Sequence, residues 1–151
     1  MLTITMNQYI NDWLEIIENM SNENTYKLAW GRAIIEICMD REIEDSITIH
    51  FYDIAHKMIK YYWNQTFFFN LKQSPNQNKK PVLVQNVEHL IEKYKELSLS
   101  NISIWFDKAE NTLNSDKNFY ENIITTCSHK LKDDVSWRFL KANKKNMHYM
   151  S

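Results

Sequence analysis

Glycine, proline and cysteine are all scarce in this sequence. One glycine and two prolines occur among 151 residues. Because sheet proteins need glycine in their tight turns, this scarcity favours helices. The single glycine also excludes a glycine-rich phosphate loop. The two cysteines, Cys38 and Cys127, are too few and too far apart for a disulfide framework or a cysteine-rich metal site. We therefore expect an all-α protein with reduced thiols.

Long apolar runs are also absent. The first twenty residues lack a basic leader and are interrupted by Asp12 and Glu15, so we expect neither a signal peptide nor a membrane span. Hydrophobic residues make up 44% of the chain, enough to build the core of one domain. We predict a single-domain multi-helix bundle over residues 1–151, with a flexible tail at 142–151, located in the cytoplasm and using no cofactor.

Apolar residues recur every three or four positions along most of the chain, which is the spacing of amphipathic helices. Gly31 falls inside one such pattern, where we expect close packing of a neighbouring helix. Residues 47–51 alternate instead as a short strand would. A last short helix is expected to be capped by Asp133 or Asp134. The other helices are predicted at 7–20, 24–39, 52–70, 82–97, around 104–113, and 116–131.

The stretch "YYWNQTFFFN", residues 61–70, contains six aromatic residues in ten positions. Its spacing makes it the C-terminal half of the helix predicted at 52–70, apolar around most of its girth. We expect Trp63, Phe67 and Phe68 to be mostly buried, and this aromatic-rich helix to be central in the bundle. A surface platform for stacking nucleic acid bases is the alternative, and it requires exposed rings.

The sequence offers few groups of residues that suggest catalysis. His50, Asp53 and His56 could suggest a metal site, but on a helix positions 50 and 56 lie about 120° apart, and no fourth ligand is evident. The side chains of Cys127 and His129, two residues apart on a helix, point in different directions and cannot form a thiolate–imidazole pair. Cys127 is therefore expected in the core. We predict no catalytic residues and no metal site.

The formal net charge of −1 conceals an asymmetry along the chain. Residues 1–50 contain three Lys or Arg against nine Asp or Glu, a charge of −6, and residues 51–151 carry +5. Residues 128–151 are the most basic part, at +4. A polyanion could bind there, although a solvated lysine-rich tail is the plainer interpretation. The candidate contacts to DNA phosphates are Lys72, Lys79, Lys80, Lys130, Lys132, Arg138, Lys141, Lys144 and Lys145.

Three segments together resemble the N-terminal helical region of a bacterial group of HNH-type endonucleases linked to restriction or phage defence. They are "TYKLAWGRAIIEI" (25–37), residues 47–94 with "YYWNQTFFFNLKQ", and "DDVSWRFL" (133–140). In that family a nuclease follows, marked by CxxC pairs and a His, Asn, His set, and this sequence has no CxxC. Its terminal "KANKKNMHYMS" departs from the family pattern. The resemblance therefore implies a non-catalytic accessory region, with a role in DNA engagement or in regulation.

Two classes of function follow from these observations. The first is DNA binding through phosphate contacts of the lysines. The second is a protein-interaction or inhibitor module, whose partner is a nuclease relative or a phage or host factor. A continuous basic face would favour DNA, whereas an exposed aromatic or acidic patch would favour a protein partner.

Overall fold

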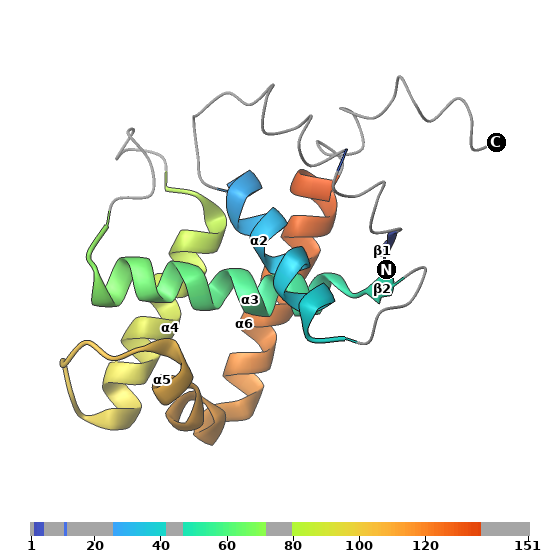
Figure 1. Ribbon diagram of the computed structural model, residues 1–151. Helices are drawn as coiled ribbons and strands as arrows, with labels where there is room; N and C mark the ends of the chain where they lie inside the picture. The colour runs from blue at the N-terminus through green and yellow to red at the C-terminus, as the bar shows by residue number, and fades with distance from the viewer. Residues whose placement is uncertain (1, 5–10, 12–25, 42–46, 72–79, 137–151) are drawn as a thin grey trace.

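The computed structural model describes residues 2–4, 11, 26–41, 47–71 and 80–136, and these form an all-α, single-domain fold (Figure 1). Short π-helical or 3-10 turns extend three of the helices: η1 (Asn64–Phe68), η2 (Asn114–Asp116) and η3 (Leu131–Ser136). The main helices are α2 (Tyr26–Met39), α3 (Phe51–Trp63), α4 (Val82–Ser98), α5 (Phe106–Leu113) and α6 (Lys117–Lys130).

Helix α3 lies at the centre of this bundle. It contacts α2, α4, α5 and α6, and Figure 1 shows it running across the molecule between α2 and the other helices. Tyr61, Tyr62 and Trp63 are all buried on it. Three aromatic residues in a row lie on different sides of a helix, so their joint burial requires neighbours on several sides. The prediction of a central aromatic-rich helix is confirmed.

Helix boundaries follow the sequence pattern closely, with three differences. α3 ends as an α-helix at Trp63 instead of continuing to residue 70. α5 begins at Phe106, so the two apolar residues before it lie outside the helix. No new helix begins at Asp133, because the backbone N–H of Leu131 still bonds to α6 carbonyls and the chain continues into η3. Asp133 and Asp134 therefore lie within η3 and do not cap a new helix, and the helix predicted after them lies mostly outside the described residues. Of the helix predicted at 7–20 only residue 11 is described, and the tail predicted at 142–151 lies outside the described residues.

The strand-like residues near position 47 form a real strand. β2 (Ile47–Ile49) pairs antiparallel with β1 (Leu2–Ile4), with Leu2 opposite Ile49. The sequence did not predict β1. This ribbon precedes α3, whose N-cap is His50.

Two small residues, Gly31 and Cys127, are buried in the helices that carry them. Gly31 is buried on α2, and α2 packs against α3, as expected for a residue without a side chain to keep the helices apart. Cys127 is buried on α6, and its burial raises the pKa of the thiol to about 11. Both residues therefore belong to the core.

The aromatic stretch changes its helical geometry halfway along. In η1 the backbone N–H of Phe69 donates to the carbonyl of Asn64 at 3.0 Å, a bond five residues back instead of four. This wider turn rotates the following side chains away from the buried face of α3. Phe67 stays partly buried against the core, but Phe68 is exposed. The prediction that Phe68 is buried is wrong, because it assumed an unbroken α-helix.

Candidate functional site

Three aromatic rings form a cluster on the surface. Phe68 and Phe69 come from η1 and its C-cap, and Trp105 is the N-cap of α5. Their residues are 41%, 53% and 42% exposed, respectively. The rings of Phe68 and Trp105 are stacked, with centroids 4.5 Å apart and planes at 27°. Phe69 packs edge-on against Trp105 at 5.4 Å. We call Phe68, Phe69 and Trp105 the aromatic cluster.

Hydrogen bonds to the residues before and after Trp105 hold its backbone at the end of α3. The indole N–H of Trp63 donates to the carbonyl of Ile104 at 2.9 Å. On the other side, the backbone N–H of Phe106 donates to Oδ1 of Asn64 at 3.0 Å. The Phe106 ring is fully buried and meets Trp63 edge-on at 5.7 Å. With its neighbours held against the end of α3, Trp105 is held at the surface beside η1.

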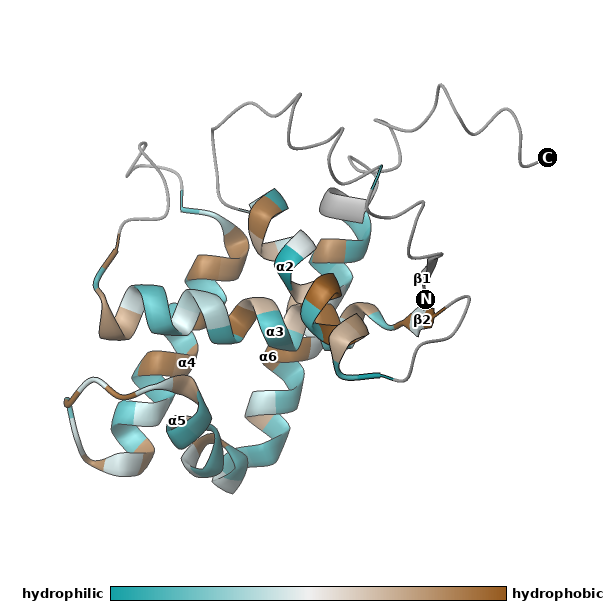
Figure 2. Cartoon of the chain, viewed as in Figure 1, coloured by the Kyte–Doolittle hydropathy of each residue, from teal (hydrophilic) through white to brown (hydrophobic). Residues whose placement is uncertain are grey.

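The loop between α4 and α5, residues 99–105, adds two further exposed apolar side chains. Leu99 is 92% and Ile102 is 77% exposed. Figure 2 shows hydrophobic segments at the tip of this loop and at the η1 end of α3, on the same end of the molecule. Leu99 also has a left-handed backbone, with φ of 53°, where glycine or asparagine is usual and another residue costs about 1–2 kcal/mol. We call this segment the α4–α5 loop.

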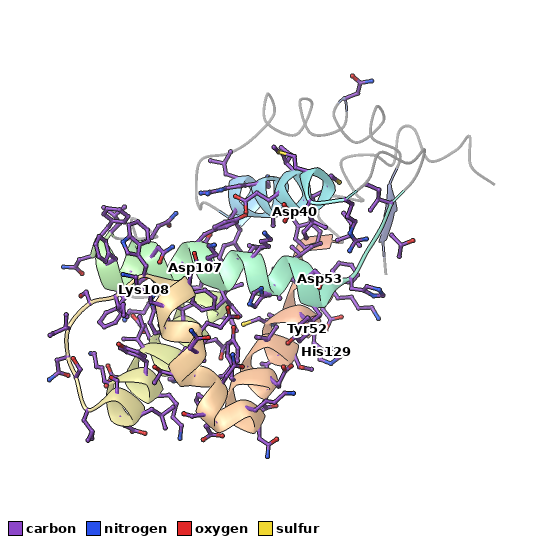
Figure 3. All side chains as sticks on the ribbon, turned by 60° about the horizontal axis from the view of Figure 1, so that its bottom comes forward. Asp40, Tyr52, Asp53, Asp107, Lys108 and His129 are labelled. Carbon is purple, nitrogen blue, oxygen red and sulfur yellow. The ribbon has the colours of Figure 1, made fainter. Side chains whose placement is uncertain are left out.

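The two sequence segments that carry these side chains contain no charged residue. Residues 64–71 and 97–106 include no Asp, Glu, Lys or Arg. The chain as a whole is 25% charged, so about four would be expected in a stretch of this combined length. The second uncharged segment is followed by Asp107 and Lys108. Figure 3 labels both residues, where α5 lies beside α3.

Two ion pairs lie beside these segments, whereas the exposed Lys108 of α5 has no ion pair among the residues that the structure describes. Nζ of Lys60 lies 2.8 Å from Oδ1 of Asp107. Nζ of Lys95 lies 3.0 Å from Oε1 of Glu92, and 5.7 Å from the ring centroid of Phe67. An uncharged apolar centre with charged groups at its edge is the usual anatomy of a protein–protein interface.

A second group of polar side chains joins α3, α5 and α6. Nε2 of His56 and the hydroxyl of Tyr120 both lie close to Oε1 of Glu110, at 2.5 and 2.6 Å. The hydroxyl of Tyr52 donates to Oε2 of Glu121 at 2.6 Å. Burial, followed by the hydrogen bonds to these carboxylates, raises the pKa of both tyrosines above its ordinary value. We call these five residues the polar clamp, because their bonds join α5 to α3 and α6, and α3 to α6.

The structure does not bring His50, Asp53 and His56 together as a metal site. His56 bonds to Glu110, whereas Asp53 lies 3.9 Å from the guanidinium of Arg41. Among the residues that the structure describes, no group of three or more His, Cys, Asp or Glu could hold a metal ion. Within that part of the chain the polar clamp is best understood as a structural element.

The candidate DNA-binding residues are only partly described. Lys80 is exposed and forms an ion pair with Glu88, Nζ to Oε1 2.7 Å. Lys130 and Lys132 are exposed close together, at the end of α6 and in η3. Of the three described candidates, Lys80 is thus neutralised by an acidic neighbour. Outside the described residues lie Lys72, Lys79, Arg138, Lys141, Lys144 and Lys145.

Sequence reasoning missed Trp105 as a functional residue. We expected it within a helix around residues 104–113, but it precedes α5 and is exposed, whereas Phe106 directly after it is fully buried. Leu97, predicted in the buried stripe of α4, is likewise exposed at the helix end. The uncharged run "LSLSNISIW" was the available signal, because an exposed loop of a charged protein is seldom so apolar.

Comparison with known proteins gives a family without an assigned role. The profile described as "Domain of unknown function (DUF8808)" matches residues 8–137. No curated protein and no solved structure matches the chain. Of the helices that the structure describes, none combines the length and apolar content needed to cross a membrane.

Proposed function

We propose that this chain, which belongs to the DUF8808 family, is a non-catalytic protein-interaction module. Its docking surface is the aromatic cluster together with the α4–α5 loop. The observation that carries the proposal is a set of three packed, exposed rings on two segments that contain no charged residue. Interface centres are enriched in aromatic residues and depleted of charge in the same way.

The energetics of the aromatic cluster support a partner. Each ring presents on the order of 100 Å² to water, so covering it would contribute roughly 2 kcal/mol before the costs of association. The isolated chain gains nothing from leaving these rings exposed. Leu99 is an exposed apolar residue at the left-handed C-cap of α4, where glycine or asparagine is more usual.

Nucleic acid is a weaker candidate for this surface. Proteins that stack bases on aromatic rings place unpaired cations beside them, to bind the phosphates. Here Lys60 and Lys95 are each paired with a carboxylate, and Lys108 of α5 is an exposed cation close to Trp105 in sequence without an ion pair among the described residues. The exposed rings therefore favour a protein partner over a base-stacking platform.

DNA binding elsewhere on the chain is a second proposal. It rests on the exposed Lys130 and Lys132 at the end of α6 and on the positive charge of residues 128–151. Neutralising about four phosphates would give a log–log salt slope near −3.6. Gel shifts on unrelated duplexes at two salt concentrations test it, and an absence of any shift at low salt contradicts it.

The biological setting that we propose is an accessory role beside an HNH-type nuclease in the cytoplasm. The resemblance of residues 25–37, 47–94 and 133–140 to the helical region of such enzymes supports this setting. In that setting the partner would be a protein of the same defence system.

Site-specific photo-crosslinking tests the docking surface while the partner is still unidentified. Benzoylphenylalanine is placed at Phe69 in the full chain, and at exposed Thr125 of α6 as the matched control. We expect a discrete protein crosslink from position 69 and none from 125. The crosslinked protein, once purified, should bind the wild-type chain and lose at least tenfold in affinity to Phe69→Ser. Crosslinks from position 69 to nucleic acid only, or to nothing, would overturn the proposal.

A further inference from the structure

Helix α2 carries a stripe of exposed apolar side chains along one face. Leu28, Ile35 and Met39 are 46%, 43% and 78% exposed. Together with the exposed Arg32 they recur at spacings of four, three and four residues, which places them on one face of the helix. We call Leu28, Ile35 and Met39 the α2 stripe. The buried residues of α2, such as Ile34, lie on the opposite face, so this helix is apolar on two sides, as helices covered by neighbours are.

We propose that the α2 stripe is the docking face for residues 7–20 of the same chain, packed as an amphipathic helix antiparallel to α2. This surface lies on a different helix from the aromatic cluster, so the inference does not depend on the proposed function. Its consequence is that α2 is not a second docking surface for a partner protein.

The two ends of the connecting chain, residues 5–25, lie at opposite ends of α2. The chain leaves β1 after Ile4, which pairs with Ile47 of β2. Arg41, two residues beyond α2, donates to the carbonyl of Thr48 in β2, and α2 itself contacts β2. The C-terminal end of α2 therefore lies beside the ribbon from which the connecting chain starts. That chain leads directly into the N-terminal end of α2, so it has to travel the length of this helix in the opposite direction.

The length of the predicted helix fits this path. α2 has 14 residues, which span about 21 Å at the rise of an α-helix. Residues 7–20 are also 14 in number and span the same distance as a helix. Residues 21–25 then form a connection of the length that joins antiparallel helices. Because both ends are tethered beside α2, the effective concentration of this segment is on the order of millimolar. A free partner, including a second copy, has no such advantage.

The sequence of residues 7–20 divides into one polar and one apolar face. At 100° per residue, its polar residues fall within an arc of about 140° and its apolar residues within the remaining arc. Asn11, the residue of this segment that the structure describes, is helical and exposed. It belongs to the polar arc, so an exposed Asn11 turns the apolar arc toward the protein. The apolar arc consists of Tyr9, Ile10, Trp13, Leu14, Ile16, Ile17 and Met20.

Antiparallel packing of two helices of equal length sets which residues meet. Ile10 lies within about one helical turn of Met39 along the common axis, and Leu14 lies within about one turn of Ile35. Apolar side chains at these separations interdigitate when helices pack. The exposed apolar residues of α2 and the apolar arc of the segment therefore face each other over the length of both helices.

Thermal melting of the full chain tests the inference with two double variants and their combination. The stripe variant is Ile35→Ser, Met39→Ser, and the segment variant is Leu14→Ser, Ile17→Ser. Each should lower the melting temperature by about 5–10 °C, because each removes the same apolar contact. The combined variant should melt within about 2 °C of the less stable double variant, since a contact is lost only once. Circular dichroism before melting establishes that each variant is folded.

Matched controls separate this contact from general effects of the substitutions. Ile102→Ser replaces an apolar residue that is 77% exposed, like Met39 at 78%, and should shift the melting temperature by less than about 2 °C. Asn11→Ser, in the polar arc, should behave in the same way. A stripe variant that melts like the wild type, or losses that add in the combined variant, would overturn the inference. So would losses that grow with protein concentration between about 5 and 500 µM, since these would indicate a second copy on the α2 stripe.

Discussion

The aromatic stretch 61–70 has two halves of similar composition and opposite location. Tyr61, Tyr62 and Trp63 are buried at the end of α3, whereas Phe68 and Phe69 lie on the surface. The π-helical turn η1 separates them. Hydrophobicity alone does not decide which aromatic residues of a segment enter the core; the register of the backbone hydrogen bonds decides it.

The two halves of the stretch also have different neighbours. The buried half is covered by the helices that pack around α3, with the ring of Trp63 contacted by Phe67, Tyr94 and Phe106. In the described part of the chain, the exposed half has ring contacts with Trp105, which is itself exposed. The same kind of residue therefore stabilises the fold on one side of the turn and is left for a partner on the other.

The largest expected effect is that of truncating the buried half. Trp63→Ala should lower the free energy of unfolding by about 3–5 kcal/mol, since it removes a fully buried ring and leaves a cavity. The hydrogen bond to Ile104 is lost as well. Urea unfolding followed by circular dichroism measures the change. A loss below about 1 kcal/mol would mean that the two halves do not differ as the structure indicates.

Most of the helices could be predicted from the sequence, because their apolar residues recur with the helical period and helices are local structures. The exposure of Phe68 could not, since a π-turn depends on a hydrogen bond to Asn64 and on the packing of α5 against α3, which are not visible in the spacing. Strand β1 was missed because its partner lies more than forty residues away in the sequence. Trp105 was misplaced by a single residue at a helix start, the least predictable part of a helix.

Removing the polar clamp should have an intermediate effect. Tyr120→Phe deletes one hydrogen bond to Glu110 and should cost about 1 kcal/mol near neutral pH. The clamp holds α5, which positions Trp105 beside Phe68, so the tryptophan fluorescence of the folded state should also change. Thermal melting at neutral pH, with the exposed Thr126→Ala of α6 as a control, measures the loss. No change in either quantity would show that the clamp does not position the aromatic cluster.

Alkaline pH tests the same clamp without a change of fold. Because the folded protein raises the pKa of Tyr52 and Tyr120, it retains protons that the unfolded chain releases above about pH 10. Their contribution to stability is therefore fully present below about pH 10 and is lost as the pH rises further. The double variant Tyr52→Phe, Tyr120→Phe should show a shallower decline between about pH 9.5 and 11. An equally steep decline in both proteins would contradict this origin.

Relieving strain in the α4–α5 loop should have a smaller effect of opposite sign. Leu99→Gly removes a side chain from a left-handed position, a gain of about 1–2 kcal/mol that is partly offset by the greater freedom of glycine in the unfolded chain. We expect a net stabilisation of about 0.5–1 kcal/mol, measured by thermal melting. Leu97→Gly, inside the last turn of α4, is the control and should be destabilising.

The smallest expected effect on the fold is that of Phe69→Ser, and it separates the two halves of the stretch most directly. Phe69 is half exposed and its contacts are with two other exposed rings, so the free energy of unfolding should change by less than about 0.5–1 kcal/mol. The same variant should weaken binding of the crosslinked partner at least tenfold, because the lost ring lies at the centre of the proposed docking surface. Measuring urea unfolding and partner binding on one preparation compares both quantities. A loss of stability as large as that of Trp63→Ala would place Phe69 in the core and remove the reason for a docking surface there.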